Sequence, residues 1–126
     1  MPALPSRALA AAVATALAAC AGCGESASVA VDATPLRLTL SEYRVEPQAV
    51  RVPAGRVTIV VRNSGTTVHR LEIRSNDRTR TLASSPPLRP GETTRLVVEL
   101  PPGTYVDTCA VERHDTLGEH GTIVAR

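Results

Sequence analysis

Residues 52–69 read VPAGRVTIVVRNSGTTVH, and this stretch decides the fold. After a Pro-Ala-Gly turn, the apolar residues Val57, Ile59 and Val61 recur at every second position, which predicts a β-strand with one buried face. The same period occurs in residues 36–40, 68–74 and 96–100, and further strands are predicted at 104–109 and 122–125. No stretch has a convincing helical period. Seven to eight short strands separated by Pro and Gly turns predict an all-β fold, a Greek-key β-sandwich.

The composition of the chain argues against two classes of protein. The chain has 126 residues, which suits one globular domain with an extension. Aromatic residues make up only 2%, and the formal charge is +2 from 14 basic and 12 acidic residues. A surface that stacks bases or tracks phosphates is therefore not expected. Three Cys are too few for a disulfide scaffold. We expect no nucleic-acid partner and no disulfide-stapled miniprotein.

The N-terminal segment has the pattern of a targeting signal. Arg7 precedes an Ala, Leu and Val run over residues 8–19, which is too short for a transmembrane helix but suits a secretory signal. Leu17-Ala18-Ala19-Cys20 then resembles the bacterial lipobox, in which the signal is cut before a Cys that carries diacylglycerol. We predict a signal peptide at 1–19, a flexible tether with lipidated Cys20 at 20–35, and a folded domain at 36–126. A plain secreted protein cut after an A-x-A site is the alternative.

The folded domain contains one Cys and three His. His69 shares a predicted strand face with Leu71 and Ile73, so it points inward, as a core residue or as a ligand. Cys109 ends a predicted strand, and His114 follows in a loop. Each residue alone is a weak signal. Two imidazoles and one thiolate from distant segments are, however, the in-plane donors of a blue-copper site.

At these residues the chain resembles the cupredoxins, the plastocyanin- and azurin-like family, over residues 36–126. The matching motifs are VPAG at 52–55 leading to a strand and His69, and PGTY at 102–105 leading to Cys109, His114 and the GEHGT of 118–122. The resemblance implies one copper ion held by His69, Cys109 and His114. The family's axial Met falls on Glu119, and His120 would replace it if the loop register shifted by one residue.

Three departures from the family pattern change the expected chemistry. Glu119 is a harder donor than a thioether, so it should favour Cu(II), lower the reduction potential and make the centre less intensely blue. Arg70 stands where the family often has a small amide or hydroxyl residue. Asp107 occupies an inward, normally apolar position, so it needs a partner near the ligands or a place at the sheet rim.

The resemblance implies a one-electron carrier that is monomeric and not an enzyme, and the lipobox-like motif adds a membrane anchor. The location would be extracytoplasmic, on the outer face of the cell membrane or in the periplasm, and the redox partner is unknown. Charged residues at 112, 113 and 115 crowd the loop around His114, which indicates a charged partner surface or no redox partner.

Two alternative functions stay open. One is a copper- or zinc-binding delivery or structural domain, because a Cys, His, His and Glu set also suits Zn²⁺. The other is a metal-free cupredoxin-like interaction module.

Overall fold

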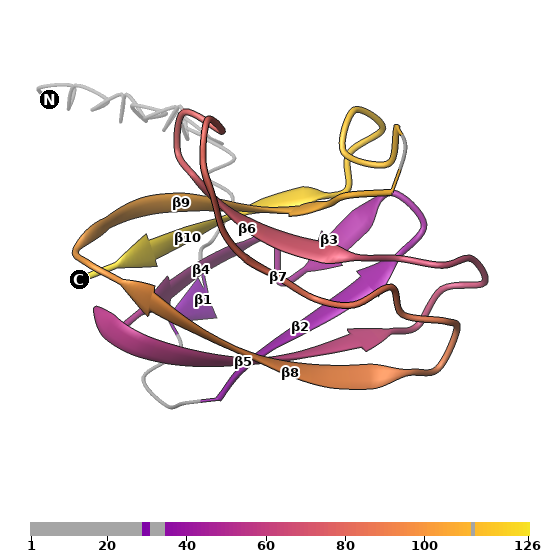
Figure 1. The fold of residues 1–126 in the computed structure, drawn as a ribbon, viewed down its shortest axis with the longest axis horizontal. Helices are drawn as coiled ribbons and strands as arrows, with labels where there is room; N and C mark the ends of the chain where they lie inside the picture. Colours follow the sequence, from indigo (N-terminus) through magenta and orange to yellow (C-terminus); the bar gives the residue numbers. More distant parts are fainter. Residues whose placement is uncertain (1–28, 31–34, 112) are drawn as a thin grey trace, which may run out of the picture.

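The computed structural model describes residues 29–30, 35–111 and 113–126 (Figure 1). The predicted signal peptide and Cys20 lie outside these residues. The described part contains strands only: β1 (Val29–Ala30), β2 (Leu36–Ser41), β3 (Arg44–Glu46), β4 (Ala49–Val52), β5 (Gly55–Asn63), β6 (Leu71–Ser75), β7 (Thr81–Ser84), β8 (Thr93–Leu100), β9 (Gly103–Cys109) and β10 (His120–Ala125). Nowhere in this part is there a helix long and apolar enough to cross a membrane.

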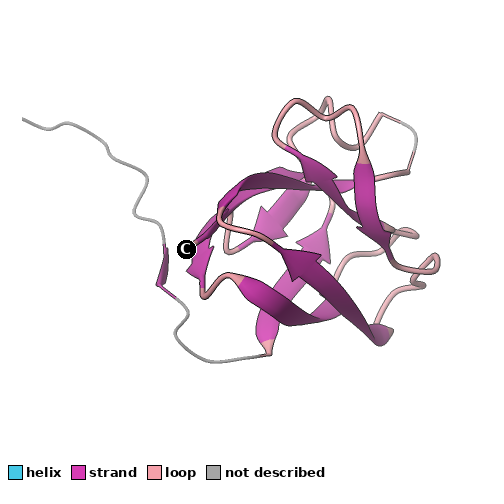
Figure 2. Ribbon diagram, turned by 60° about the vertical axis from the view of Figure 1, so that its left-hand side comes forward, coloured by secondary structure: helices cyan, strands magenta, loops and turns pink. Residues whose placement is uncertain are grey.

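The strands form two sheets that pack as a sandwich (Figure 2). One sheet has the order β1-β4-β10-β9-β6-β7, and the other has the order β3-β2-β5-β8. Strand β10 is parallel to β4 and antiparallel to β9, and β2 is parallel to β5 and antiparallel to β3. Sequence neighbours are therefore often not spatial neighbours. The predicted all-β sandwich is confirmed.

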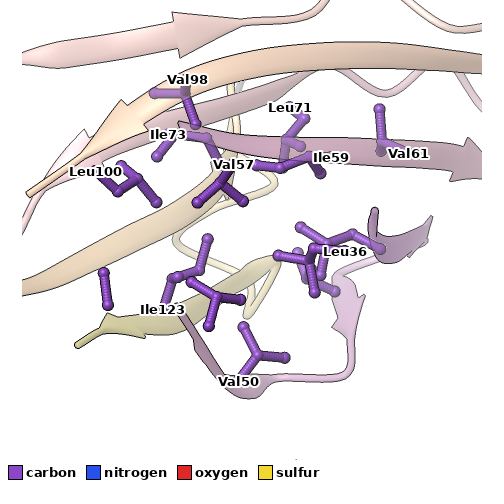
Figure 3. Close-up of a cluster of buried hydrophobic side chains, with 14 of the residues drawn as sticks. Leu36, Val50, Val57, Ile59, Val61, Leu71, Ile73, Val98, Leu100 and Ile123 are labelled. Atoms are coloured by element: carbon purple, nitrogen blue, oxygen red, sulfur yellow. The ribbon is translucent and has the colours of Figure 1, made fainter. Parts of the chain in front are cut away.

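The core lies between the two sheets and is almost entirely aliphatic (Figure 3). Its residues come from the alternating positions of the strands, as the burial of every second residue in β5 illustrates. Period-two apolar residues reach the core together because successive side chains of a strand point to opposite faces. The largest fully buried aliphatic side chains are Leu36, Leu38, Leu40, Ile59, Leu71, Ile73, Leu100 and Ile123.

Three details of the sequence-based description differ from the structure. The described residues form ten strands rather than seven to eight, because the short strands β1 and β3 carry too few residues to show a period. The strand expected at 68–74 begins only at Leu71, and His69 forms an isolated bridge to Leu88 instead. Residues 29–30, inside the predicted tether, pair with β4 as β1.

Candidate metal centre

The loop between β5 and β6 places His69 through one buried amide side chain. Asn63 donates from Nδ2 to the backbone carbonyls of Thr67 and Leu88, each at 2.8 Å, and its Oδ1 accepts the Gly65 N–H at 2.8 Å. The backbone of His69 exchanges two hydrogen bonds with Leu88, at 3.0 and 2.8 Å. These bonds fix the His69 backbone although it lies outside a regular strand. Its side chain is fully buried.

The other polar side chains of the site come from the end of β9 and the loop that follows, drawn in orange to yellow at the upper right of Figure 1. Cys109 is the last residue of β9, and its N–H donates to the Glu119 carbonyl at 3.0 Å. The Glu119 N–H donates in turn to the His114 carbonyl at 3.0 Å. The Val111 N–H points at the Cys109 sulfur at 3.5 Å. The loop therefore folds back so that its two ends meet beside Cys109.

Four potential donor atoms converge between these segments. The Cys109 Sγ lies 3.8 Å from His69 Nδ1 and 3.7 Å from His114 Nδ1. The Glu119 carboxylate approaches the same two nitrogens, with Oε1 2.6 Å from His69 Nδ1 and Oε2 3.0 Å from His114 Nδ1. All four donor atoms lie within 4.8 Å of one another. The structure thus brings together the four predicted residues, and His120 is not in this group.

The Glu119 carboxylate shows that this cluster is more than a hydrogen-bond network. Its side chain is fully buried, and neither oxygen has a hydrogen-bond partner among the described residues, despite the short distances to two imidazole nitrogens. A buried carboxylate without hydrogen bonds is costly. A cation between the oxygens, the nitrogens and the sulfur would remove that cost. The donor set therefore fits a metal ion, and a thiolate with two imidazoles suits copper.

Burial governs the protonation of these groups. It raises the pKa of Glu119 to about 7 and the pKa of the Cys109 thiol to about 11. Burial also lowers the pKa of His69, which keeps its imidazole neutral. A neutral imidazole is ready to bind a metal, whereas the thiol must first lose its proton. Metal binding at this site is therefore coupled to proton release.

The surface around His114 is more apolar than the sequence indicates. The His114 side chain is 15% exposed, and the Tyr43 ring meets it edge-on with 5.5 Å between ring centroids. Tyr43 is an exposed large hydrophobic residue, and so is Leu117, which donates its N–H to the His114 carbonyl at 3.2 Å. Tyr43 lies in the β2–β3 turn, far from His114 in sequence, and no local motif identifies it. The charged residues of the loop thus share this surface with apolar ones.

Arg70 and Asp107 can now be placed. The Arg70 side chain is exposed and donates from Nε to the Ser84 hydroxyl and the Ser85 carbonyl, and none of the four donors is among these partners. Asp107 is fully buried in β9, so the suggestion that it sits at the rim is wrong. Neither of its carboxyl oxygens has a hydrogen-bond partner among the described residues. Burial raises the pKa of Asp107 to about 7.

The chain belongs to the cupredoxin-like domain family, whose model matches residues 9–125. No curated protein matches it significantly. Among solved structures it is similar to dithionite-reduced auracyanin from the photosynthetic bacterium Roseiflexus castenholzii, with 22% identity, a TM-score of 0.68, and coverage of 76% of this chain and 99% of that one.

Two further solved structures are similar. Auracyanin A, a "blue" copper protein of Chloroflexus aurantiacus, shares 21% identity at a TM-score of 0.62 and covers 73% of this chain and 99% of its own. A purple cupredoxin from Nitrosopumilus maritimus shares 18% identity at a TM-score of 0.55, with coverage of 72% and 99%. At these identities the likeness establishes the fold, and the chemistry must be argued from this chain's own residues.

Proposed function

We propose that this protein is a one-electron carrier that binds a single copper ion. His69 Nδ1, Cys109 Sγ and His114 Nδ1 would supply the strong ligands, and the Glu119 carboxylate the fourth. The observation that carries this proposal is the buried Glu119 carboxylate, which faces both Nδ1 atoms and the thiol without a hydrogen bond. With four protein donors around one ion, no position is left for a substrate, so we expect no catalytic turnover.

Copper supplies the redox step by changing between Cu(I) and Cu(II), and the chain supplies the rest. Both sheets and the Asn63 hydrogen bonds hold the donors in place, which suits electron transfer because little rearrangement is then needed between the oxidation states. His114 is the only partly exposed member of the four-residue group. We infer that electrons enter and leave through its edge, beside Tyr43.

Glu119 sets the expected colour and potential. A carboxylate is a harder donor than the thioether of a blue-copper site and stabilises Cu(II) over Cu(I). We therefore expect a reduction potential below that of a Met-ligated centre and a visible band that is altered from blue. Related folds include both a "blue" copper protein and a purple cupredoxin, which supports absorption as an informative readout.

The test is a Cu(II) titration of the purified protein followed by absorption and electron paramagnetic resonance. One equivalent of Cu(II) should produce a strong thiolate charge-transfer band, and Cys109→Ser should abolish it. Cys23→Ser is the matched control, because Cys23 lies outside the predicted ligand set, and it should keep the band. Absence of any band in the wild type, with the Cys109 thiol still free, would refute the proposal. Tight Zn²⁺ binding in that case would point to a structural metal instead.

We further propose that the protein is extracytoplasmic and anchored through lipidated Cys20. The lipobox-like LAAC of residues 17–20 supports this location, and two acyl chains on one Cys suffice for stable anchoring. Cys20→Ser should move the protein from the membrane fraction to the soluble fraction, whereas Cys23→Ser should leave it in the membrane. Retention of the Cys20→Ser variant in the membrane would indicate an uncleaved signal segment as the anchor.

A further inference from the structure

The far side of the His69 ring faces a second carboxylate. Its Nδ1 points toward Cys109, while its Nε2 lies 3.4 Å from the Thr67 hydroxyl oxygen and 3.6 Å from Glu42 Oε1. The Thr67 hydroxyl is itself 3.4 Å from the same Glu42 oxygen. A proton on Nε2 can therefore be donated to Thr67, whose own hydroxyl proton is donated to Glu42. This chain of donors runs from the buried ring to a partly exposed carboxylate.

Glu42 is held in place by a dense set of contacts. Its Oε1 accepts the N–H of Thr66 at 2.5 Å and of Thr67 at 3.0 Å, and the Thr66 hydroxyl lies at 3.1 Å. A Cβ at position 65 would lie 2.5 Å from the same oxygen, so Gly65 provides the space in which the carboxylate approaches this loop. The Thr66 N–H, with further hydrogen bonds, lowers the pKa of Glu42 to about 2. Glu42 is therefore an anion at neutral pH.

A fixed anion on the Nε2 side has two consequences for His69. Glu42 favours the proton of the neutral ring on Nε2, which leaves the Nδ1 lone pair free, whereas the Glu119 carboxylate 2.6 Å from Nδ1 favours the other tautomer in metal-free protein. The negative charge also makes Nδ1 a stronger electron donor, as outer carboxylates do for metal-bound imidazoles. Burial opposes a positive ring, and Glu42 acts against that effect. Both consequences favour a metal on the Nδ1 side.

We propose that Glu42, acting with Thr67, is a positioning residue that fixes the His69 tautomer and strengthens its Nδ1 as a ligand. This inference rests on the proposed copper function. Glu42 would be an anion of the site that does not contact the metal. Like Glu119, it would stabilise Cu(II) over Cu(I). Glu42 follows β2, so two separate segments bring carboxylates to opposite sides of one imidazole.

The decisive variant is Glu42→Gln, because it keeps an oxygen for the Thr66 and Thr67 N–H groups while it removes the charge. Asp77→Asn is the matched control. Asp77 also anchors a turn, with its Oδ1 accepting from the Thr79 N–H at 3.0 Å. It lies beyond Ser75, at the other end of β6 from the Leu71–Cys109 pair. Thermal unfolding of each variant establishes that the fold is kept.

Two readouts test the proposal in all three proteins. In metal-free protein, ¹⁵N nuclear magnetic resonance should show a smaller share of the Nε2–H tautomer of His69 in Glu42→Gln than in the wild type and in Asp77→Asn. In competition titrations with Cu(II), Glu42→Gln should bind about 10–100-fold more weakly than the wild type, while Asp77→Asn changes little.

Each outcome separates this proposal from the copper function. An unchanged tautomer and an unchanged Cu(II) affinity in Glu42→Gln would overturn the role of Glu42 while leaving copper binding intact. An equal loss of affinity in Asp77→Asn would assign the effect to general loop stability and would also overturn it. If the wild type binds no copper, the proposed function fails, and the tautomer measurement still decides whether Glu42 orients His69. Thr67→Val should reproduce the tautomer change without altering a charge.

Discussion

Glu119 and Asp107 are two buried carboxyl groups with different surroundings. Both side chains are 0% exposed, both lack hydrogen-bond partners among the described residues, and burial raises both pKa values to about 7. Glu119 faces two imidazoles and a thiol. Asp107 instead lies in β9 between the paired positions Ile73 of β6 and Gly121 of β10.

The difference shows what turns a buried charge into a site. Desolvation destabilises the charged form of both carboxyl groups. Around Glu119, three other donors could share a cation and convert that cost into metal affinity. Around Asp107, no described residue offers such a group. Burying the Asp107 carboxyl therefore lowers the stability of the fold without creating a binding site. The raised pKa values alone would make the two carboxyl groups equally good candidates for a functional site. Only the positions of the neighbouring donor atoms identify Glu119 as the candidate ligand.

The largest expected effect comes from Glu119→Met. A thioether in place of the carboxylate removes the hard donor, so Cu(II) should bind at least about tenfold more weakly relative to Cu(I). The reduction potential should rise and the visible band should become that of a blue site. Protein-film voltammetry and absorption of the copper-loaded variant measure both. Asp107→Asn is the comparison, with a smaller shift expected because Asp107 is not among the donors. An unchanged potential in Glu119→Met would point to His120 or to no axial ligand.

A stability gain is expected from Asp107→Val. Valine is close to aspartate in size, suits a strand, and leaves no buried carboxyl unpaired. The variant should therefore be more stable than the wild type by about 1–3 kcal/mol at pH 8, as judged by urea unfolding of metal-free protein. Loss of stability would mean that Asp107 has a partner outside the described residues, and the contrast with Glu119 would then disappear.

The sequence predicts the inner strands well because they follow period-two patterns. Residues 36–40 and 57–61 alternate because one face is buried, and the same alternation correctly turns His69 inward. The short strand β3 has a single buried residue, Val45, so its position follows from pairing with β2 and leaves no local signal.

Glu42 and Tyr43 mark the limit of reading the site from sequence. Both follow β2 and meet the imidazoles only after the chain has folded. An acidic residue after a strand is ordinary, and nothing near it in the chain signals a histidine. The resemblance to the cupredoxins predicts an inward position for Asp107, but its lack of partners depends on what β6 and β10 place beside it. Contacts of this kind are set by tertiary pairing rather than by local pattern.

The free energy of unfolding, measured against pH, should distinguish the two carboxyl groups. The expected change is smaller than those above and is spread over several pH units. The pKa of Asp107 rises from 3.8 to about 7 in the folded protein. The folded state therefore binds its proton more tightly than the unfolded state does. Its contribution to stability is complete below about pH 3.8 and is lost as the pH rises through 7. Glu119 behaves in the same direction in metal-free protein, from 4.5 to about 7.

Urea unfolding between pH 4 and pH 8 measures this contribution as the difference between the wild type and Asp107→Asn. The wild type should lose more stability over this range than the variant. Bound Cu(II) should remove the share of the pH dependence that belongs to Glu119, because the metal keeps that carboxylate ionised, and leave the share of Asp107. A wild-type profile parallel to that of Asp107→Asn would contradict the burial of an unpaired Asp107.

The smallest expected effect is a coupling between Asp107 and Gly121. A Cβ at position 121 would lie 2.6 Å from both Asp107 Oδ1 and the Gln48 carbonyl oxygen. Gly121→Ala should therefore destabilise the protein through overpacking, and part of that loss should vanish in the Asp107→Ala background. The coupling energy from urea unfolding of the two single variants and the double variant should be about 1 kcal/mol. Strict additivity would show that the Gln48 backbone alone requires glycine there, whereas coupling would show that Gly121 provides the space in which the Asp107 carboxyl is buried.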